Sequence, residues 1–335
     1  MTSKSMSWSA EPFLLRPAGK DYLWGGRRLR DDFSKDIDME PLAETWECST
    51  HPDGVSVVAS GEHEGMELTE LLRAHPEYLG AHPSPDGSLP ILIKLIDAER
   101  DLSIQVHPDD EYARANENGA LGKSEMWYVL DAKRDAALIY GFKDDIGRDA
   151  LLGALERGEV LRYLQRVPVR KGDVFFIPAG QVHAICAGAL ICEVQQSSNI
   201  TYRLYDYDRV DKRGDRRALH IEKALDVADL RSSAEPRQPM RVLHFQKGAA
   251  LELLCRCKYF QVERMLINTE RVREMAAIQT GASSFETLLC TDGCGVLYWG
   301  EGRMINFYKG DCIFIPARSV PIRIHGQAEL LKVSC

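Results

Sequence analysis

The sequence predicts a mainly β protein with two related β domains, and three observations support this prediction. Residues 171–183, KGDVFFIPAGQVH, recur as residues 309–321, KGDCIFIPARSVP, and a repeated segment indicates a repeated structural unit. Residues 89–97 are almost continuously apolar, as in a buried strand. Residues 102–107 alternate between apolar and polar side chains, which is the period of a half-buried strand.

Length and composition describe an ordinary globular protein. The chain has 335 residues, of which 44% are hydrophobic and 27% charged, and this gives room for two core-forming domains. The net charge of -8 argues against a general nucleic-acid binder, which would carry a basic surface. It permits an anionic small substrate, because a local cluster of Arg and Lys can outweigh a distant acidic surface.

The cysteines and the N-terminus indicate a cytoplasmic protein. The nine cysteines are scattered and include no CxxC pair, so we expect free thiols in a reducing compartment. Residues 1–10 are polar and lack the apolar core of a secretory signal. No run approaches the roughly 18 apolar residues of a membrane span. We expect no nucleic-acid or membrane partner, and a monomer or a weak homo-oligomer.

In chain order, the expected elements form a tail and two domains. Residues 1–12 are expected to be a loose tail, residues 13–235 the first domain and residues 240–335 the second. In the first domain, the expected strands lie at 55–59, 89–97, 102–107, 123–130 and 137–140, and a short helix lies at 68–72. A small helical insertion is expected near 147–165, where Gly158 divides two amphipathic pieces. In the second domain, strands are expected near 259–267, 285–290, 296–299 and 329–333.

The two copies of the repeat differ in their polar residues. His183 of the first copy corresponds to Pro321 of the second. The segment 122–125, GKSE, has its expected counterpart in 281–284, GASS, where the Glu is missing. A β scaffold with one working site and one degenerate copy would leave this asymmetry, so we expect the site in the first domain.

Four polar residues of the first domain are candidates for a metal site. Gln105 and His107 share one face of a strand that Pro108 ends, while Glu125 and His183 fall at or near strand ends. Two imidazoles and a carboxylate suit Zn²⁺, and an amide oxygen can serve as a weaker fourth ligand. Such an ion favours a substrate that develops negative charge on oxygen. The alternative is that the histidines are ordinary core or surface residues.

Three basic residues are further candidates. Lys94 lies within an apolar strand, where an unpaired ammonium would be too costly, so it must meet a substrate or an internal carboxylate. Arg203 could bind a phosphate or an oxyanion in fork geometry; the alternative is a surface ion pair with Asp206 or Asp208. His51 follows a strand, and it is either solvated or part of the site lining.

Several motifs in a fixed order resemble the mannose-6-phosphate isomerases, in the short bacterial form of the type I family. The motifs lie at 24–26, 44–47, 105–108, 122–128, 176–183 and 195–209. The resemblance covers most of the chain from about residue 13 to residue 335. It implies two cupin-like β-sandwich or jelly-roll domains, one zinc ion per chain, and the interconversion of mannose 6-phosphate and fructose 6-phosphate.

The resemblance also implies roles for individual residues. The metal ligands of the family fall on Gln105, His107, Glu125 and His183, and its active-site arginine falls on Arg203. Zinc and Arg203 would stabilise the charge of an enediol intermediate, and the implied substrate is a small sugar phosphate.

The remaining roles are less clearly assigned by the family pattern. Lys94 and Lys123 are candidates for contacts with the phosphate or the sugar. Glu193 and His51 are candidates for the proton carrier. Longer members carry an Asp where this chain has Asn199, so any basic role of that Asp must lie elsewhere here.

Two other functions stay open from the sequence. Two histidines and one carboxylate on a cupin scaffold also describe a non-haem Fe(II) oxygenase, although the compact His-x-His spacing of that group is absent. The second alternative is a non-catalytic bicupin that binds a sugar phosphate without turnover. Metal analysis with dioxygen uptake tests the first alternative, and binding without turnover would favour the second.

Overall fold

The computed structural model describes residues 10–81, 86–210, 214–238 and 241–335, and these residues form two compact units. The terminal unit comprises the described residues within 1–18, 46–92 and 240–335, and the central unit those within 19–45 and 93–239. The expected tail at 1–12 lies mostly outside the described residues. The expected domain boundaries, 13–235 and 240–335, stay a prediction. The compact units divide the chain in another way, because residues 46–92 belong to the terminal unit.

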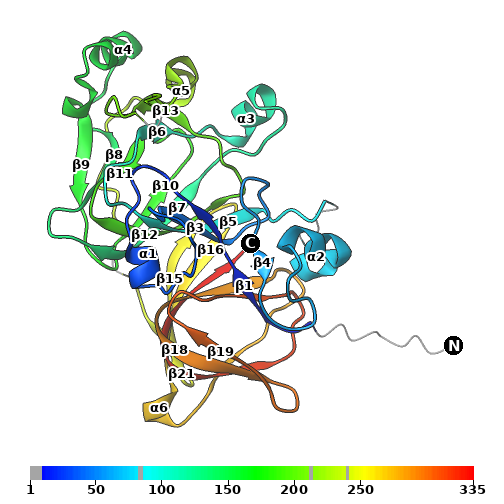
Figure 1. Ribbon diagram of the computed structural model, residues 1–335. Coiled ribbons are helices and arrows are strands. Elements are labelled where there is room, and N and C mark those ends of the chain that lie inside the picture. Colours follow the sequence, from blue (N-terminus) through cyan, green and yellow to red (C-terminus); the bar gives the residue numbers. More distant parts are fainter. Residues whose placement is uncertain (1–9, 82–85, 211–213, 239–240) are drawn as a thin grey trace. The chain divides into compact units, whose positions relative to one another are not determined.

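The terminal unit contains a ten-stranded antiparallel sheet (Figure 1). Its main path runs through β14 (His244–Gln246), β15 (Ala249–Arg256), β16 (Gln261–Asn268), β21 (Ile322–Ser334), β18 (Glu286–Trp299), β20 (Cys312–Ile315), β1 (Phe13–Arg16) and β4 (Val57–Val58). Two further strands, β17 (Ala276–Ile278) and β19 (Arg303–Tyr308), pair with β21 and β18. Its helices are α2 (Leu68–Ala74), η1 (Pro76–Leu79) and α6 (Thr269–Val272).

The other two sheets lie wholly or mostly in the central unit. The six-stranded sheet has the order β10 (Val174–Ile177), β7 (Glu125–Ala132), β12 (Ala189–Gln196), β5 (Ile91–Asp97), β3 (Glu44–Cys48) and β2 (Ala18–Lys20). The five-stranded sheet has the order β13 (Tyr202–Tyr205), β6 (Ile104–Val106), β11 (His183–Ile185), β8 (Ala137–Phe142) and β9 (Leu164–Pro168). The helices are α1 (Arg28–Asp31), α3 (Asp110–Asn116), α4 (Arg148–Glu156), η2 (Val160–Arg162) and α5 (Ile221–Val227).

The two sheets of the central unit form a sandwich. Trp127 and Ile177 of the six-stranded sheet pack in one buried core with Leu138 and Ile185 of the five-stranded sheet. Because side chains alternate along a strand, the neighbouring residue Ile139 points to the opposite face. The sheets therefore enclose a common core, as sandwiches do.

The expected helical insertion covers the outer face of the five-stranded sheet. Leu151 of α4 and Leu225 of α5 share a second buried core with Ile139 of β8. Gly158 adopts a φ of +68° between α4 and η2, where the insertion was expected to divide. These helices lie together at the top of the view in Figure 1. The insertion thus shields apolar side chains that the sandwich leaves outside.

The internal repeat is confirmed at the level of backbone hydrogen bonds. Gly172 and Gly310 have φ values of +89° and +100°, which L side chains adopt only with strain. Each glycine N–H donates over 2.8 Å to a carbonyl of the neighbouring strand, at Val129 in one unit and Cys290 in the other. The same tight turn therefore precedes β10 and β20.

One expectation about the second copy is wrong. Ile177 of β10 pairs with Glu125, and the equivalent Ile315 of β20 pairs with Glu286. The Glu is therefore present in the second copy. It is Glu286, two residues after Ser284, which is the position that corresponds to Glu125 when Gly122 is aligned with Gly281. The loops before the two strands differ in length, whereas hydrogen-bond register fixes which residues correspond.

The second copy lacks the histidines. Gln105 pairs with His183 in the central unit, and Ile278 pairs with Ile322 in the terminal unit. Extending the second register by one residue places Gln279 opposite Pro321. The residue equivalent to His107 is then Gly281, so both imidazole positions are occupied by residues without a metal-binding side chain.

Candidate metal centre

The candidate ligands come from three strands of the central unit, and local sequence explains their positions. Gln105 lies in β6, and His107 follows its last residue, Val106. Pro108 cannot continue the ladder, and the Asp109 carboxylate accepts a hydrogen bond of 2.8 Å from the Tyr112 N–H at the start of α3. His107 is thus fixed between a strand and a helix.

Close backbone packing brings the next strand to the same place. A Cβ at Gly122 would lie 2.4 Å from the Asp109 carbonyl carbon, so only glycine fits there without displacement. The chain then enters β7 at Glu125. His183 is the first residue of β11 and pairs with Gln105. All four predicted ligands therefore meet in one region.

His107, Glu125 and His183 form a compact, buried cluster. Their potential ligand atoms all lie within 4.8 Å of one another. Glu125 Oε2 lies 3.6 Å from His107 Nε2, and Glu125 Oε1 lies 3.3 Å from His183 Nε2. The three residues are at most 1% exposed. Such burial is unfavourable for polar groups unless they are paired or bind a cation.

Backbone carbonyls fix the orientation of both imidazole rings. His107 Nδ1 donates to the Ile200 carbonyl over 2.7 Å, and His183 Nδ1 donates to the Gln181 carbonyl over 2.8 Å. Since a carbonyl only accepts, each Nε2 carries the lone pair that faces the cluster. Burial lowers the pKa of His107 well below its ordinary value and that of His183 to about 4. Both rings are therefore neutral and able to bind a metal.

The cluster brings together acceptors that need a cation. Glu125 Oε1 is buried and accepts no hydrogen bond from the described residues, and its near neighbour, His183 Nε2, is also an acceptor. Gln105 reaches the same place, with its Nε2 3.4 Å from His183 Nε2. A half-turn of the amide presents the oxygen of Gln105 instead. The donor set therefore fits a divalent metal ion with nitrogen and oxygen ligands.

Lys123 lies within this cluster. Its ammonium contacts Glu125 Oε2 and lies 3.1 Å from His107 Nε2 and 3.7 Å from Glu193 Oε1. The ammonium therefore places a positive charge beside the acceptor atoms of Glu125 and His107. Lys123, predicted as a substrate contact, thus has its charge beside the candidate metal ligands.

Lys94 meets internal carboxylates, as one of the two sequence hypotheses proposed. Its Nζ lies 3.6 Å from Glu44 Oε2 and 3.5 Å from Glu193 Oε1. Burial favours the neutral amine, but Glu44 and Glu193 outweigh it and raise the pKa of Lys94 above its ordinary value. Sequence reasoning missed Glu44. The signal was available, because a glutamate in an apolar strand also needs a partner.

Two of the buried glutamates of the site, Glu125 and Glu193, differ in their pKa shifts. Burial raises the pKa of Glu125 to about 7, with a further contribution from Glu193. Burial acts in the same direction on Glu193, but Lys123 and Lys94 outweigh it and lower its pKa. Glu193 also accepts a hydrogen bond of 2.9 Å from Trp127 Nε1. Glu193 is therefore ionised at neutral pH.

Arg203 lies directly beside the ligands. It pairs with Gln105 across β13 and β6, and both line a narrow cavity of about 70 Å³ together with Lys94, Lys123 and Glu193. The Nε of Arg203 is buried and bonds none of the described residues. The alternative of an ion pair with Asp206 or Asp208 is not observed, because other arginines bind those carboxylates.

His51 is not among these residues. It belongs to the terminal unit, where its ring meets the edge of Trp46 at a centroid distance of 5.7 Å. Its Nδ1 accepts a hydrogen bond of 3.1 Å from the Asp53 N–H. The structure therefore brings together the predicted site residues of the central unit, and His51 has its contacts within the terminal unit.

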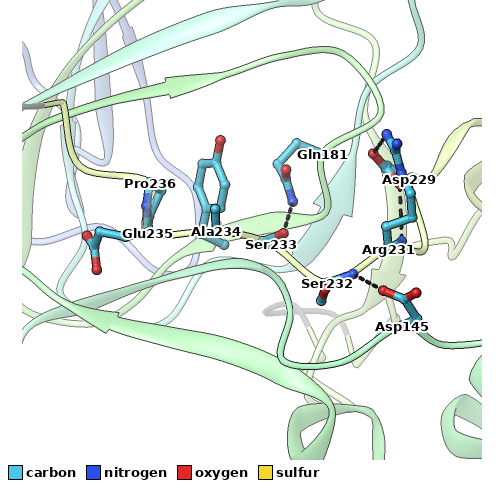
Figure 2. Close-up of a pocket in the computed structure, with 10 residues that line it drawn as sticks. Asp145, Gln181, Asp229, Arg231, Ser232, Ser233, Ala234, Glu235 and Pro236 are labelled. Carbon is cyan, nitrogen blue, oxygen red and sulfur yellow. Dashed lines mark hydrogen bonds and ion pairs between the residues drawn. The ribbon is translucent and has the colours of Figure 1, made fainter.

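A second hollow of the central unit, about 450 Å³ in volume, is lined by polar residues already bonded to one another (Figure 2). Gln181 Nε2 donates to Ser233 Oγ over 3.2 Å, and the Ser232 N–H donates to Asp145 over 2.7 Å. Arg231 pairs with Asp229 at 2.6 Å. None of the described residues that line this hollow belongs to the metal cluster, but the Gln181 carbonyl orients His183, and Tyr140 of the lining pairs with His183 in the sheet.

Comparison with known proteins gives similarity along nearly the whole chain. Residues 13–134 match the family model "Phosphomannose isomerase type I, catalytic domain". The mannose-6-phosphate isomerase ManA of Bacillus subtilis is 37% identical over 331 residues, which covers 96% of this chain and 98% of that protein. A mannose-6-phosphate isomerase of Streptococcus mutans is 45% identical over 218 residues, covering 65% of this chain and 68% of that protein.

Solved structures agree with the fold. The crystal structure of the mannose 6-phosphate isomerase from Bacillus subtilis has a TM-score of 0.88 at 35% identity and covers 97% of this chain and 99% of that chain. This match confirms the mainly β fold with cupin-like sandwich domains. A mannose 6-phosphate isomerase bound with zinc and yttrium has a TM-score of 0.74 at 17% identity, covering 97% and 99% of the two chains. At that identity it supports the fold alone.

Proposed function

Because this chain belongs to the type I family of mannose-6-phosphate isomerases, we propose that it interconverts D-mannose 6-phosphate and D-fructose 6-phosphate through an enediol. The observation that carries the proposal is the buried cluster of His107, Glu125 and His183, in a chain similar to such isomerases over almost its whole length. The reaction moves hydrogen between C1 and C2 of one sugar, so it needs neither an oxidant nor a second substrate.

The proposed cofactor is one zinc ion per chain. His107, Glu125 and His183 would hold it, with the Gln105 amide oxygen as fourth ligand. Its contribution is Lewis acidity toward the substrate oxygens, which lowers the free energy of negative charge on them. The neutral imidazoles and the single carboxylate of the cluster leave a zinc ion with net positive charge.

Arg203 is the proposed catalytic residue. It lines the cavity next to Gln105, and its guanidinium makes no ion pair with a described residue. A fixed positive charge at this place stabilises an oxyanion without first breaking an internal bond. Lys94 and Lys123 remain proposed substrate-binding residues; their ammonium groups lie within 3.7 Å of Glu193, so they also hold this carboxylate in place.

Glu193 is the better supported proton carrier of the two candidates. It lines the same cavity as Arg203 and Gln105, and the lysines keep it ionised, as a base requires. As a carboxylate it would remove the proton from C2 and return a proton to C1. Trp127 fixes one of its oxygens, which leaves the other toward the lysines.

A second candidate function has one observation in its favour. Two histidines and one carboxylate are also the ligands of non-haem Fe(II) oxygenases. Dioxygen uptake by the iron-loaded protein would support that function, whereas oxygen-independent isomerisation by the zinc-loaded protein supports ours. A non-catalytic sugar-phosphate binder would bind mannose 6-phosphate without forming fructose 6-phosphate.

The direct test is an assay of fructose 6-phosphate formation from mannose 6-phosphate under anaerobic conditions. We expect turnover that depends on the enzyme concentration and runs in both directions to the same equilibrium. Absence of turnover by the metal-loaded protein would contradict the proposal. We further propose a cytoplasmic location and a monomer or weak homo-oligomer without nucleic-acid or membrane partners. None of the helices in the described part of the chain is long and apolar enough to cross a membrane.

A further inference from the structure

The two lysines of the site are poorly placed to neutralise a phosphate. Lys94 lies between Glu44 and Glu193, and Lys123 contacts Glu125. Each positive charge thus already faces at least one buried carboxylate. Removing an ammonium from such partners leaves them buried and uncompensated, which is strongly unfavourable. Because three carboxylates, those of Glu44, Glu125 and Glu193, surround the two lysines, no positive charge is in excess there, and the phosphoryl group of a substrate needs such an excess.

Arginines supply an excess of positive charge at another part of the same cavity wall. Arg203 and Arg217 both line the cavity, and the charge of Arg217 contributes, after burial, to a lowered pKa of Arg203. Arg217 donates hydrogen bonds to the carboxylate of Asp206, which also accepts a hydrogen bond from Arg209. Arg209 and Arg217 therefore share a single carboxylate and Arg203 lies within reach of their charge, so positive charge is in excess here, which favours an added anion.

Asp206 holds Arg217 in one orientation. Arg217 Nε and Nη2 donate to the two carboxylate oxygens over 2.8 and 2.5 Å. The Nη1 amino group bonds none of the described residues, so one edge of the guanidinium stays available. One such edge of Arg217 matches the geometry by which arginine binds phosphate oxygens.

We propose that Arg217, positioned by Asp206, binds the phosphoryl group of the substrate and sets the preference for phosphorylated sugars. The inference rests on the proposed function, because it assigns one end of the same substrate. Arg203 pairs with Gln105 beside the metal ligands, and the phosphate lies at the opposite end of the sugar from C1 and C2. A sugar phosphate whose C1 and C2 meet the metal cluster and Arg203 therefore places its phosphate elsewhere along the cavity wall, where Arg217 offers a guanidinium edge that bonds none of the described residues.

The charges and the exposure of Arg217 agree with this assignment. A phosphate monoester carries about -1.5 to -2 charges at neutral pH, which the excess of positive charge around Asp206 offsets. The side chain of Arg217 is 26% exposed while that of Lys94 is 6% exposed, so Arg217 is the more accessible of the two to an entering anion.

The test compares Arg217→Ala with Arg216→Ala. Arg216 is the matched control, because it is adjacent in sequence, 68% exposed, and paired with Asp208. For Arg217→Ala we expect KM for mannose 6-phosphate to rise about 10- to 100-fold, the effect of losing a hydrogen bond to a charged group, with a smaller change in kcat. Competitive inhibition by inorganic phosphate should weaken in parallel, and Arg216→Ala should match the wild type.

Each failure has a distinct signature. If the wild type converts mannose 6-phosphate and Arg217→Ala keeps its KM and its inhibition by phosphate, the phosphate assignment is wrong while the proposed function stands. If the wild type shows no turnover, the proposed function is wrong, and calorimetric titration of both proteins with inorganic phosphate decides the inference separately. Should Arg217→Ala fail to fold, Arg217→Lys keeps the charge without the fork, and an unchanged KM there would overturn the proposal.

Discussion

At the scale of residues, hydrogen bonds to the backbone orient two ordinary histidines as candidate metal ligands. The Gln181 and Ile200 carbonyls each bind one ring nitrogen and direct the other toward Glu125. Burial keeps both rings neutral, and the glutamate oxygen between them has no described donor. Histidine and glutamate are common residue types, and it is the common orientation of His107, Glu125 and His183 that makes a candidate metal site.

Substitutions of His183 and Arg203 separate metal binding from catalysis. His183→Ala removes one of the four proposed ligands, so we expect loss of both zinc and turnover. Arg203→Ala leaves the ligands intact, so we expect wild-type zinc content with kcat reduced about 100- to 1,000-fold, as for removal of an oxyanion-stabilising donor. Metal analysis and steady-state kinetics measure both. The exposed His244 serves as control, and retained turnover in metal-free His183→Ala would refute the mechanism.

Lys94 gives a prediction about stability. Lys94→Met leaves Glu44 and Glu193 buried without their shared cation, which should lower the free energy of unfolding by about 3–5 kcal/mol. Lys133 is the control, since its ion pair with Glu99 is about half exposed, and Lys133→Met should change stability by less than about 1 kcal/mol. Urea unfolding monitored by tryptophan fluorescence compares them, and equal midpoints would contradict an internal role for Lys94.

Sequence reasoning identified most of the polar residues at this scale but not their contacts. Gln105, His107, Glu125 and His183 could be selected because strand alternation and strand ends are visible in the sequence. The partnership of Lys94 with Glu44, and that of Arg217 with Asp206, could not, because neither local pattern nor spacing specifies which distant side chains meet.

At the scale of elements, the repeated turn before β10 and β20 shows what local sequence determines. The Gly-Asp pair makes the same bonds in both units because positive φ at Gly172 and Gly310 is built into the segment. The partner strands were harder to align, and Glu286 was overlooked. Sequence motifs locate a strand, but the neighbouring strand is set by register, which depends on long-range hydrogen bonds.

The glycines of this turn should be costly to replace. Gly172→Ala meets no atom within 4 Å, so its effect isolates backbone strain at φ +89°, which we expect to lower stability by about 1–2 kcal/mol. Gly310→Ala should behave similarly. A Cβ at Gly281 would meet Ser283 Oγ at an ordinary contact distance of 3.9 Å, and Gly281 has no positive φ, so Gly281→Ala should be nearly neutral. Thermal unfolding ranks the three variants by melting temperature. Equal melting temperatures would show that the turn is not strained.

At the scale of the whole molecule, pairing between distant segments determines the units. β1 and β4, from the first sixty residues, belong to the same sheet as β20 of the repeat. The repeat predicted two β units, and the resemblance predicted their cupin-like fold. Neither indicated that N-terminal strands join C-terminal ones, because hydrophobic periodicity gives the type of a strand and not its neighbour.

Metal binding should be visible in the stability of the chain. Zinc that binds the folded cluster and not the unfolded chain adds about 2.7 kcal/mol of stability at a concentration of 100 Kd. We therefore expect a higher melting temperature for the zinc-loaded protein than for the chelated protein. His183→Ala should show no such difference, and an equal zinc response in that variant would place the metal elsewhere.

The central claim is that a metal ion at His107, Glu125 and His183 enables isomerisation of mannose 6-phosphate. The most direct measurement is a coupled assay of fructose 6-phosphate formation before chelation, after removal of chelator and metal, and after readdition of one equivalent of zinc. We predict that turnover disappears with the metal and returns with zinc in proportion to the zinc bound. Undiminished turnover by protein shown to be metal-free would contradict the account.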